Sequence, residues 1–118
     1  MRLICFLLFY GLCTFFAYGQ VLVTRNDKIE VFDVHGKYLA QGYYSDLTEA
    51  VAGNNIVIIR FLNHKIEVRS LRLNYISSAY FADVERISAA GDYVVVYYQN
   101  GRVEVRDEKL KFISAWYR

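Results

Sequence analysis

The sequence contains no proline, and its two cysteines, Cys5 and Cys13, both lie near the start of the chain. The absence of proline excludes collagen-like chains and proline-rich linkers. An excess of one charge is also missing, because 14 Lys and Arg residues stand against 12 Asp and Glu residues. That balance predicts neither a basic surface for nucleic acid nor an acidic tail. With 55% hydrophobic and 17% aromatic residues, the 118-residue chain is too apolar to be disordered and is about one domain long.

Residue types that carry catalytic or metal-binding chemistry are also scarce. The two histidines, His35 and His64, fall in predicted turns, and no cysteine or second histidine is near either of them. Turn histidines of this kind are usually solvated side chains rather than metal ligands. The sequence has no Gly-x-Ser-x-Gly, no His-Glu-x-x-His and no glycine-rich phosphate loop. We therefore predict that the protein is not an enzyme and has no metal or cofactor.

Residues 1–19 differ in character from the rest of the chain. Arg2 precedes an apolar run over residues 3–16, which ends in Ala17-Tyr18-Gly19. A cation, a short apolar run and small residues at the −3 and −1 positions are typical of a secretory signal peptide. We predict a signal over residues 1–19, cleaved before Gln20, and a secreted or periplasmic location. An uncleaved membrane anchor and an ordinary buried strand are the alternatives, although a membrane span needs roughly 20 apolar residues.

The predicted exported domain, residues 20–118, is organised by a repeat with a period of 37 residues. The period is marked by Lys28-Ile29-Glu30-Val31, Lys65-Ile66-Glu67-Val68 and Arg102-Val103-Glu104-Val105. Each period has four runs rich in β-branched and aromatic residues, separated by Gly, Asn and Asp, which predicts four strands. In the middle period these runs are Leu47–Ala52, Ile56–Leu62, Lys65–Ser70 and Tyr75–Phe81.

The second and third runs differ in how their apolar residues are spaced. The second runs, residues 56–59 and 93–98, are apolar throughout, so both faces of these strands should be buried. The third runs alternate, with Ile29 and Val31 on one face and charged residues on the other. That charged face, which includes Glu30, Glu67 and Glu104, is predicted to be solvated and to carry cross-strand charge pairs; an interaction rim is the alternative.

Two residues separate the second run from the third in every period. They are Asn26-Asp27, Asn63-His64 and Asn100-Gly101. A two-residue hairpin loop favours a type I′ turn, in which both residues have a positive φ. Asn and Gly tolerate that conformation, so we predict a two-residue type I′ hairpin in each period.

Four antiparallel strands in about 40 residues is the period of a β-propeller blade. In this respect the chain resembles WD40-like and quinoprotein-like propeller repeats, and residues 94–107 resemble the middle hairpin of such a blade. The Gly-His pair and the Trp-Asp dipeptide of WD40 repeats are absent. The resemblance implies an all-β fold with two full blades and one incomplete blade. By the repeat register, the first run of the incomplete blade would be Tyr10–Phe15, inside the predicted signal.

A closed propeller has about four to eight blades, so a shorter stack leaves two terminal faces uncovered. These faces should carry apolar runs such as residues 21–23 and 93–96, with no evident charged residues. Large exposed apolar patches mark interfaces. We therefore predict an exported, non-enzymatic protein-interaction or structural module that binds another protein or forms a dimer or trimer. The alternatives are a carbohydrate-binding module and a degenerate fragment of a longer propeller.

The candidate interaction residues recur with the repeat. The fourth runs carry Tyr43, Tyr80 and Tyr117, and Trp116 adjoins the last of these. Such aromatic residues pack between blades, contact protein partners or stack on sugar rings, and the sequence leaves these alternatives open. Asp46 and Asp83 occupy equivalent connections, and Arg86 follows the second of them. Ligand contact is the functional interpretation of these residues, and an Asx turn is the structural one.

Overall fold

The structure, a computed structural model, describes residues 13–14 and 21–118, and the regular elements in this part of the chain are all strands. They are β1 (Cys13–Thr14), β2 (Val21–Arg25), β3 (Lys28–Phe32), β4 (Tyr38–Tyr43), β5 (Leu47–Ala52), β6 (Ile56–Phe61), β7 (Lys65–Ser70), β8 (Tyr75–Tyr80), β9 (Val84–Ala90), β10 (Tyr93–Tyr98), β11 (Arg102–Arg106) and β12 (Phe112–Tyr117). Each group of four consecutive strands forms one antiparallel sheet in chain order. We call these sheets the first, second and third blades. The all-β prediction with four strands in each period is confirmed.

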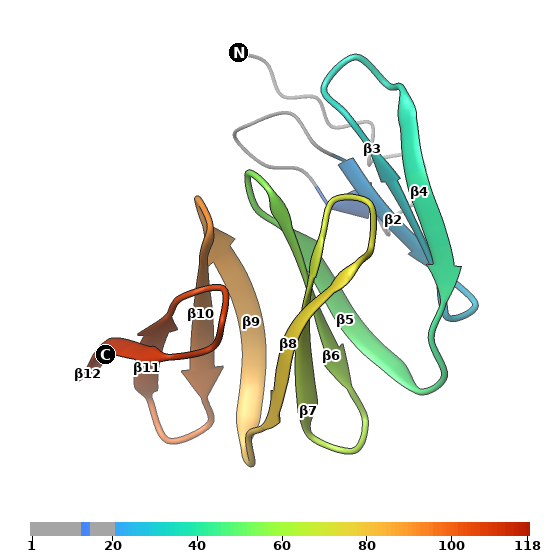
Figure 1. Cartoon of the computed structure of the whole chain (residues 1–118). Coiled ribbons are helices and arrows are strands. Elements are labelled where there is room, and N and C mark those ends of the chain that lie inside the picture. Colours follow the sequence, from blue (N-terminus) through green and yellow to red (C-terminus); the bar gives the residue numbers. More distant parts are fainter. Residues whose placement is uncertain (1–12, 15–20) are drawn as a thin grey trace.

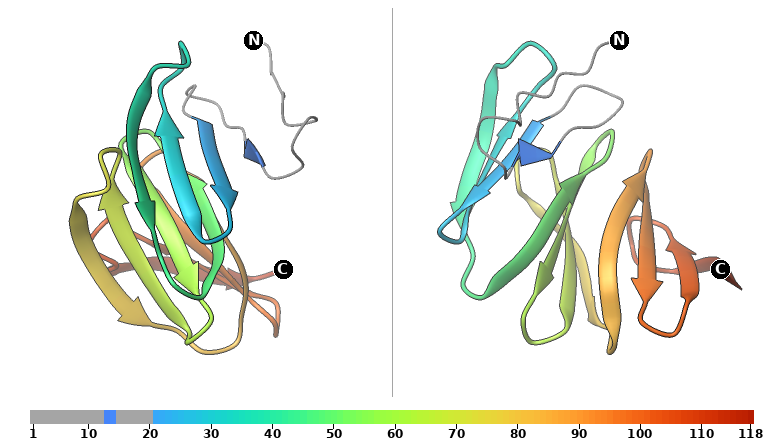
Figure 2. Two further views of the ribbon diagram at one scale, coloured as in Figure 1. Left: turned by 90° about the vertical axis from the view of Figure 1, so that its right-hand side faces the viewer. Right: turned by 180° about the vertical axis from the view of Figure 1, so that it is seen from behind.

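The three blades lie side by side like the ribs of a fan (Figures 1 and 2). The second blade is in the middle, where its strand β5 contacts β2 of the first blade and β9 of the third. One hydrophobic cluster fills each of the two seams between blades. No other described sheet packs against the outer face of the first or third blade, so these two faces end the stack.

The prediction that the second runs are buried on both faces is confirmed for residues 56–59 of β6 but is wrong for residues 93–98, because Tyr93 is 50% exposed on the outer face of the third blade. Val57 and Ile59 are fully buried in the seam with the first blade. Ile56 and Ile58 are fully buried in the seam with the third. An alternating strand could fill only one of these seams, and therefore residues 56–59 of β6 are all apolar.

The first blade includes the two-residue strand β1. Thr14 pairs with Leu22 and Cys13 pairs with Val23, which places β1 at the inner edge of the sheet. The repeat register assigned this position to Tyr10–Phe15. The rest of the predicted signal peptide lies outside the described residues. Within the described residues there is no helix that is long and apolar enough to cross a membrane.

The hairpin prediction is correct in the first blade and wrong in the other two. Asn26 and Asp27 both have a positive φ, 52° and 64°, and Arg25 pairs with Lys28 around this two-residue turn. In the second and third blades the loops have three residues, Leu62–His64 and Gln99–Gly101, and only the last residue of each has a positive φ. Here the chain makes a tight turn and then a bulge, a geometry typical of three-residue hairpin loops.

Candidate protein-binding face of the third blade

The outer face of the third blade is a surface of alternate residues from all four of its strands. We call it the end face. Its members are Arg86, Ser88, Tyr93, Val95, Tyr97, Val103, Val105, Ser114 and Trp116, as the strand register places them. Val94 and Val96, which lie between them on β10, point the other way and are buried against the second blade. The run over residues 93–96 therefore divides between the seam and the end face.

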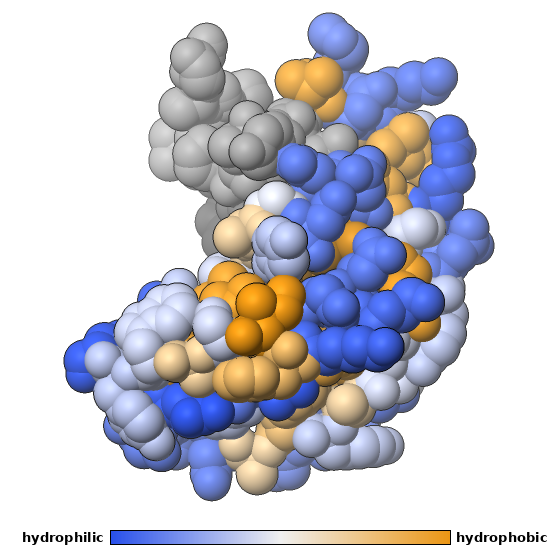
Figure 3. All heavy atoms as spheres, turned by 60° about the vertical axis from the view of Figure 1, so that its left-hand side comes forward, coloured by the Kyte–Doolittle hydropathy of each residue, from blue (hydrophilic) through white to orange (hydrophobic). Residues whose placement is uncertain are grey.

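Two cross-strand rows form the centre of the end face. One row joins Ser88, Val95, Val105 and Ser114, all with small or β-branched side chains. The next row joins Arg86, Tyr97, Val103 and Trp116, in which larger side chains flank a valine. Figure 3, turned so that the side of the third blade comes forward, shows apolar side chains between hydrophilic ones on this side of the molecule. By the strand register, the end face itself has nearly buried valines, Val95 at 8% and Val103 at 2% exposed, below a taller aromatic rim.

The rim combines exposed rings with positive charge. Tyr93 and Trp116 are each 50% exposed, although they lie beside nearly buried valines. The guanidinium of Arg86 lies 3.6 Å from the centroid of the Tyr97 ring, and that of Arg118 lies 5.5 Å from the same centroid. Arg118 also pairs with Glu85 at 2.8 Å. The expectation that charged residues are missing from this face is therefore wrong, because Arg86 lies within it.

The predicted tyrosines lie elsewhere. Tyr43, Tyr80 and Tyr117 end the outermost strands of the three blades and are 67%, 67% and 63% exposed. Each is paired across strands with a cation of the preceding strand, namely Lys28, Lys65 and Arg102. Because neighbours on a strand point to opposite faces, Tyr117 does not share the end face with Trp116. The structure therefore brings together Arg86 and Trp116 but not the three tyrosines.

Asp46 and Asp83 have equivalent backbone roles. Both have a positive φ, 61° and 60°, and their carbonyls accept hydrogen bonds from the amides of Leu62 and Gln99 at 2.9 Å. Asx turns form instead at Asp33 and Asp107, whose carboxylates accept two backbone amides each, and at the hairpin residues Asn63 and Asn100. The recurrence of Asp46 and Asp83 thus follows from the left-handed backbone conformation, which Asp tolerates better than most residues.

Asp83 also lines a polar pocket of about 610 Å³ beside the β10–β11 hairpin, together with Asn100, Arg102 and Glu104. Asn100 accepts the amide of Arg102, and Glu104 accepts hydrogen bonds from the Arg102 guanidinium, so these three lining groups already have partners. In the described residues, no three His, Cys, Asp or Glu side chains gather where they could hold a metal ion. The pocket is therefore less suited to binding than the end face.

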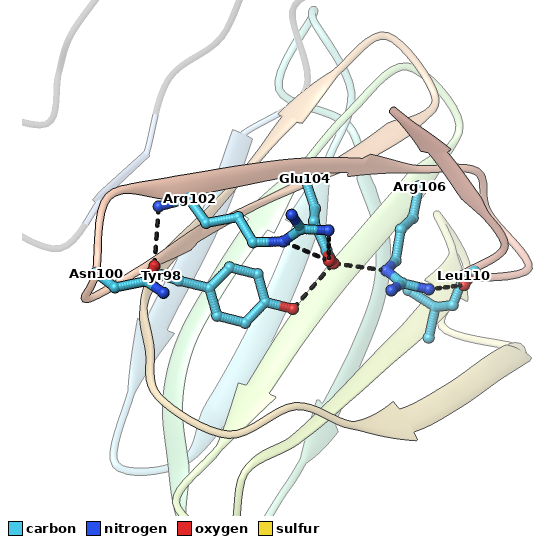
Figure 4. A network of polar contacts seen from close by, with 6 residues as sticks. All are labelled: Tyr98, Asn100, Arg102, Glu104, Arg106 and Leu110. Atoms are coloured by element: carbon cyan, nitrogen blue, oxygen red, sulfur yellow. Dashed lines mark hydrogen bonds and ion pairs between the residues drawn. The ribbon is translucent and has the colours of Figure 1, made fainter. Parts of the chain in front are cut away.

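The prediction that the charged face of the third runs is solvated is wrong in the second and third blades. Glu67 and Glu104 are only 4% and 6% exposed. In the second and third blades, this face of the strand packs against the preceding blade, and the glutamates are buried there. Glu104 accepts hydrogen bonds from Arg102, Arg106 and the Tyr98 hydroxyl (Figure 4). Burial acts to raise the pKa of Glu104, but these hydrogen bonds outweigh it and the pKa lies below its usual value. Burial and the bond to Glu104 raise the pKa of Tyr98 to about 12.

Two further contacts at the seams were not predicted from the sequence. Leu73 and Leu110 have a positive φ, 66° and 63°, yet each is buried in a seam cluster. Arg69 and Arg106 bond the carbonyls of these leucines at 2.8 Å and 2.9 Å. The available signal was a leucine at the same place in two polar turns, 37 residues apart.

Comparisons with known proteins agree with this geometry. No protein-family model matches the chain, and no curated protein matches it in sequence. Among solved structures it is similar to BamB from Moraxella catarrhalis, with a TM-score of 0.65 and 12% identity over 90% of this chain and 34% of that one. It is similar to HIRA(644–1017), with a TM-score of 0.66 and 12% identity over 79% of this chain and 35% of that one. For BBS1N in complex with ARL6DN the TM-score is 0.63, with 16% identity over 84% of this chain and 33% of that one.

The described chain forms three blades of a β-propeller. At these identities the likeness shows the fold alone. The chain spans about a third of the length of the propeller proteins that it matches. A three-blade propeller stack has two terminal faces, and the end face is one of them.

Proposed function

We propose that the chain is an exported, non-enzymatic protein-interaction module and that the end face of the third blade is its docking surface. The observation that carries the proposal is the rim of Tyr93 and Trp116, each 50% exposed, together with Arg86, over the nearly buried Val95 and Val103. Aromatic residues and arginine around an apolar centre are the residues enriched at protein interfaces. BBS1N, one of the similar propellers, was itself solved in complex with a second protein.

Export is the second part of the proposal, and it rests on the sequence of residues 1–19. Cleavage before Gln20 would remove β1 and leave β2 as the inner edge of the first blade. An exposed strand edge presents backbone groups that pair readily with another chain. The proposed processing therefore adds a second reason for the exported chain to associate with a protein.

The docking surface can be tested by site-specific photo-crosslinking in the cell that makes the protein. A photoreactive amino acid replaces Trp116 in the end face or, as a control, Leu62, which is 70% exposed at a hairpin tip away from that face. We expect a discrete protein adduct from position 116 and none from position 62. No adduct from position 116, or equal adducts from both positions, would contradict the proposal.

Carbohydrate binding is a second candidate, favoured by one observation. Tyr43, Tyr80 and Tyr117 form three equivalent exposed rings, each with a cation on the neighbouring strand. Rings that repeat in this way suit a multivalent ligand. Binding to a glycan array that is lost when all three tyrosines become alanine would favour this function. Retention of binding by that triple variant would exclude these tyrosines as the site.

A further inference from the structure

We propose that the partner of the end face is a second copy of this chain, whose first blade docks on it head to tail. This inference rests on the proposed function and names its partner. Two copies joined in this way at both ends would close a ring of six blades, which is within the range of about four to eight blades in propellers. The two seams inside the chain show which contacts such a junction must make.

The apolar floor of the end face repeats the surface that the second blade presents to the third. Val95, Val103 and Val105 occupy the repeat positions of Ile58, Ile66 and Val68. The latter three are fully buried in the second seam. The end face therefore keeps the apolar positions that, inside the chain, are covered by a following blade.

The polar contacts of the inner seams pair an aromatic ring of the preceding blade with an arginine of the following one. Arg69 lies 5.2 Å from the centroid of the Tyr44 ring. Arg106 lies 5.0 Å from the centroid of the Phe81 ring. In each case the arginine also pairs with the buried glutamate of its own strand.

At the two terminal faces these two residue types are exchanged. The position of Tyr44 and Phe81 is taken by Arg118, and that of Arg69 and Arg106 by Phe32. The equivalence of Arg118 is structural, because its amide bonds the β10–β11 hairpin carbonyl of Gly101 at 3.0 Å, as the amides of Tyr44 and Phe81 bond their own hairpins. A head-to-tail junction would therefore restore the arginine–aromatic contact with the partners reversed.

The presence of Phe32 in place of an arginine also explains why Glu30 has one cationic partner among the described residues, whereas Glu67 and Glu104 have two. In the first blade Glu30 pairs with Lys28 at 3.3 Å, and Phe32 occupies the place of the second cation that Glu67 and Glu104 have. Arg118 of another copy, placed against Phe32, would supply that cation. Arg118 is half-exposed and now pairs with Glu85 on the surface, so the guanidinium can turn to Glu30.

Side-chain size is exchanged as well. In the second seam, small Ala79 of one blade and large Leu110 of the next pack in the same cluster. At the terminal faces Trp116 takes the position of Ala79, and Gly36 takes that of Leu110. A Cβ at Gly36 would have no heavy atom within 4 Å, so this side of the first blade has room for a large ring.

Of two hydrogen bonds that cross the second seam, one can be repeated at a head-to-tail junction and the other cannot. Ser77 donates to the carbonyl of Glu108 across the second seam at 2.7 Å, and Ser114 and exposed Val34 hold these two positions at the terminal faces. By contrast, Glu49 accepts the amide of Ile87 across that seam, whereas its equivalent on the end face is Arg86, which cannot accept. The seam hydrogen bonds are thus only partly repeated at the junction. The reversed arginine–aromatic pair is the contact whose change tests it best.

The test is an exchange of residues measured by sedimentation of the full chain. Phe32→Arg would place two arginines at the junction, and Arg118→Tyr would place two rings there and leave Glu30 without its second cation. Each change should raise the dissociation constant about tenfold. The double variant recreates the arginine–aromatic order of the inner seams, and its dissociation constant should return to within about threefold of the original.

Two controls separate association from folding. Glu85→Gln removes the ion pair that Arg118 has to leave on docking and removes no junction contact, so this variant should associate at least as tightly as the unmodified chain. Phe32→Arg should melt at an unchanged temperature when monomeric, because Arg69 and Arg106 occupy the same strand position above Tyr75 and Phe112.

A monomeric mass for the unmodified chain at every concentration would overturn the head-to-tail pair, and so would failure of the double variant to recover. A crosslink from position 116 to a different protein would overturn it while leaving the proposed docking surface intact. Absence of any crosslink from position 116 would instead contradict the proposed function itself.

Discussion

Gly53 lies where the β5–β6 turn of the second blade meets the β9–β10 turn of the third. A Cβ at this position would be 2.1 Å from the carbonyl oxygen of Gly91, and that carbonyl accepts the amide of Asn54 at 3.0 Å. Gly53→Ala should therefore force two backbones apart and lower the free energy of unfolding by at least about 2 kcal/mol, measured by urea denaturation. Gly36→Ala is the matched control, because its site is open and costs only the left-handed φ of +81°, about 1 kcal/mol. Equal losses in both variants would contradict the close approach.

The burial of Tyr98, together with its hydrogen bond to Glu104, predicts a loss of stability in alkali. Tyr98 has a pKa of about 12 in the folded chain, against 10 for an ordinary exposed tyrosine. A group whose pKa is raised by folding stabilises the folded state below its unfolded pKa, and this stabilisation is lost as the pH rises through the folded pKa. Between pH 10 and 12 the free energy of unfolding should therefore fall more steeply in the original chain than in Tyr98→Phe. Parallel curves in chemical denaturation would show that folding does not raise the pKa of Tyr98.

At the scale of elements, the β10–β11 hairpin depends on the backbone of Gly101, whose φ is +93°. Gly101→Val would put a β-branched residue in this conformation and should cost about 1–2 kcal/mol of unfolding free energy. His64→Val, at the equivalent site with a φ of +77°, should cost less, because that site already accommodates a Cβ. Thermal unfolding of both variants measures the difference. A Gly101→Val melt at the original temperature would mean that the hairpin can adopt another turn.

At the scale of the whole molecule, the predicted signal determines which chain is exported. Cleavage after Gly19 should give a protein whose N-terminus is Gln20, a residue that readily cyclises when it is terminal. Mass spectrometry of the exported protein measures this directly. Recovery of chains that keep Met1 from a membrane fraction would instead support the uncleaved anchor. In that case β1 would remain available to complete the first blade.

Part of this architecture could be predicted because it can be read from the order of residue types along the chain, without knowing which strands pack together. The 37-residue period, the four strands in each period and the apolar run of β6 are local patterns of residue type. The two-residue turn at Asn26-Asp27 was predicted correctly for the same reason. Arg86 and Trp116 were also identified as candidates, although nothing in the sequence indicated that they belong to one face.

Only the tertiary structure decided which surfaces meet. Lys65-Ile66-Glu67-Val68 suggested a solvated charged face, yet Glu67 is buried, because another blade packs over that face. The identical pattern at Glu30 ends the stack and stays partly exposed. The alternation of a strand specifies two faces, but not which neighbour covers each of them. Burial, the shifted pKa of Glu104 and the exchange of Phe32 and Arg118 follow from the position of each blade in the stack, and that position is a property of the assembled sheets.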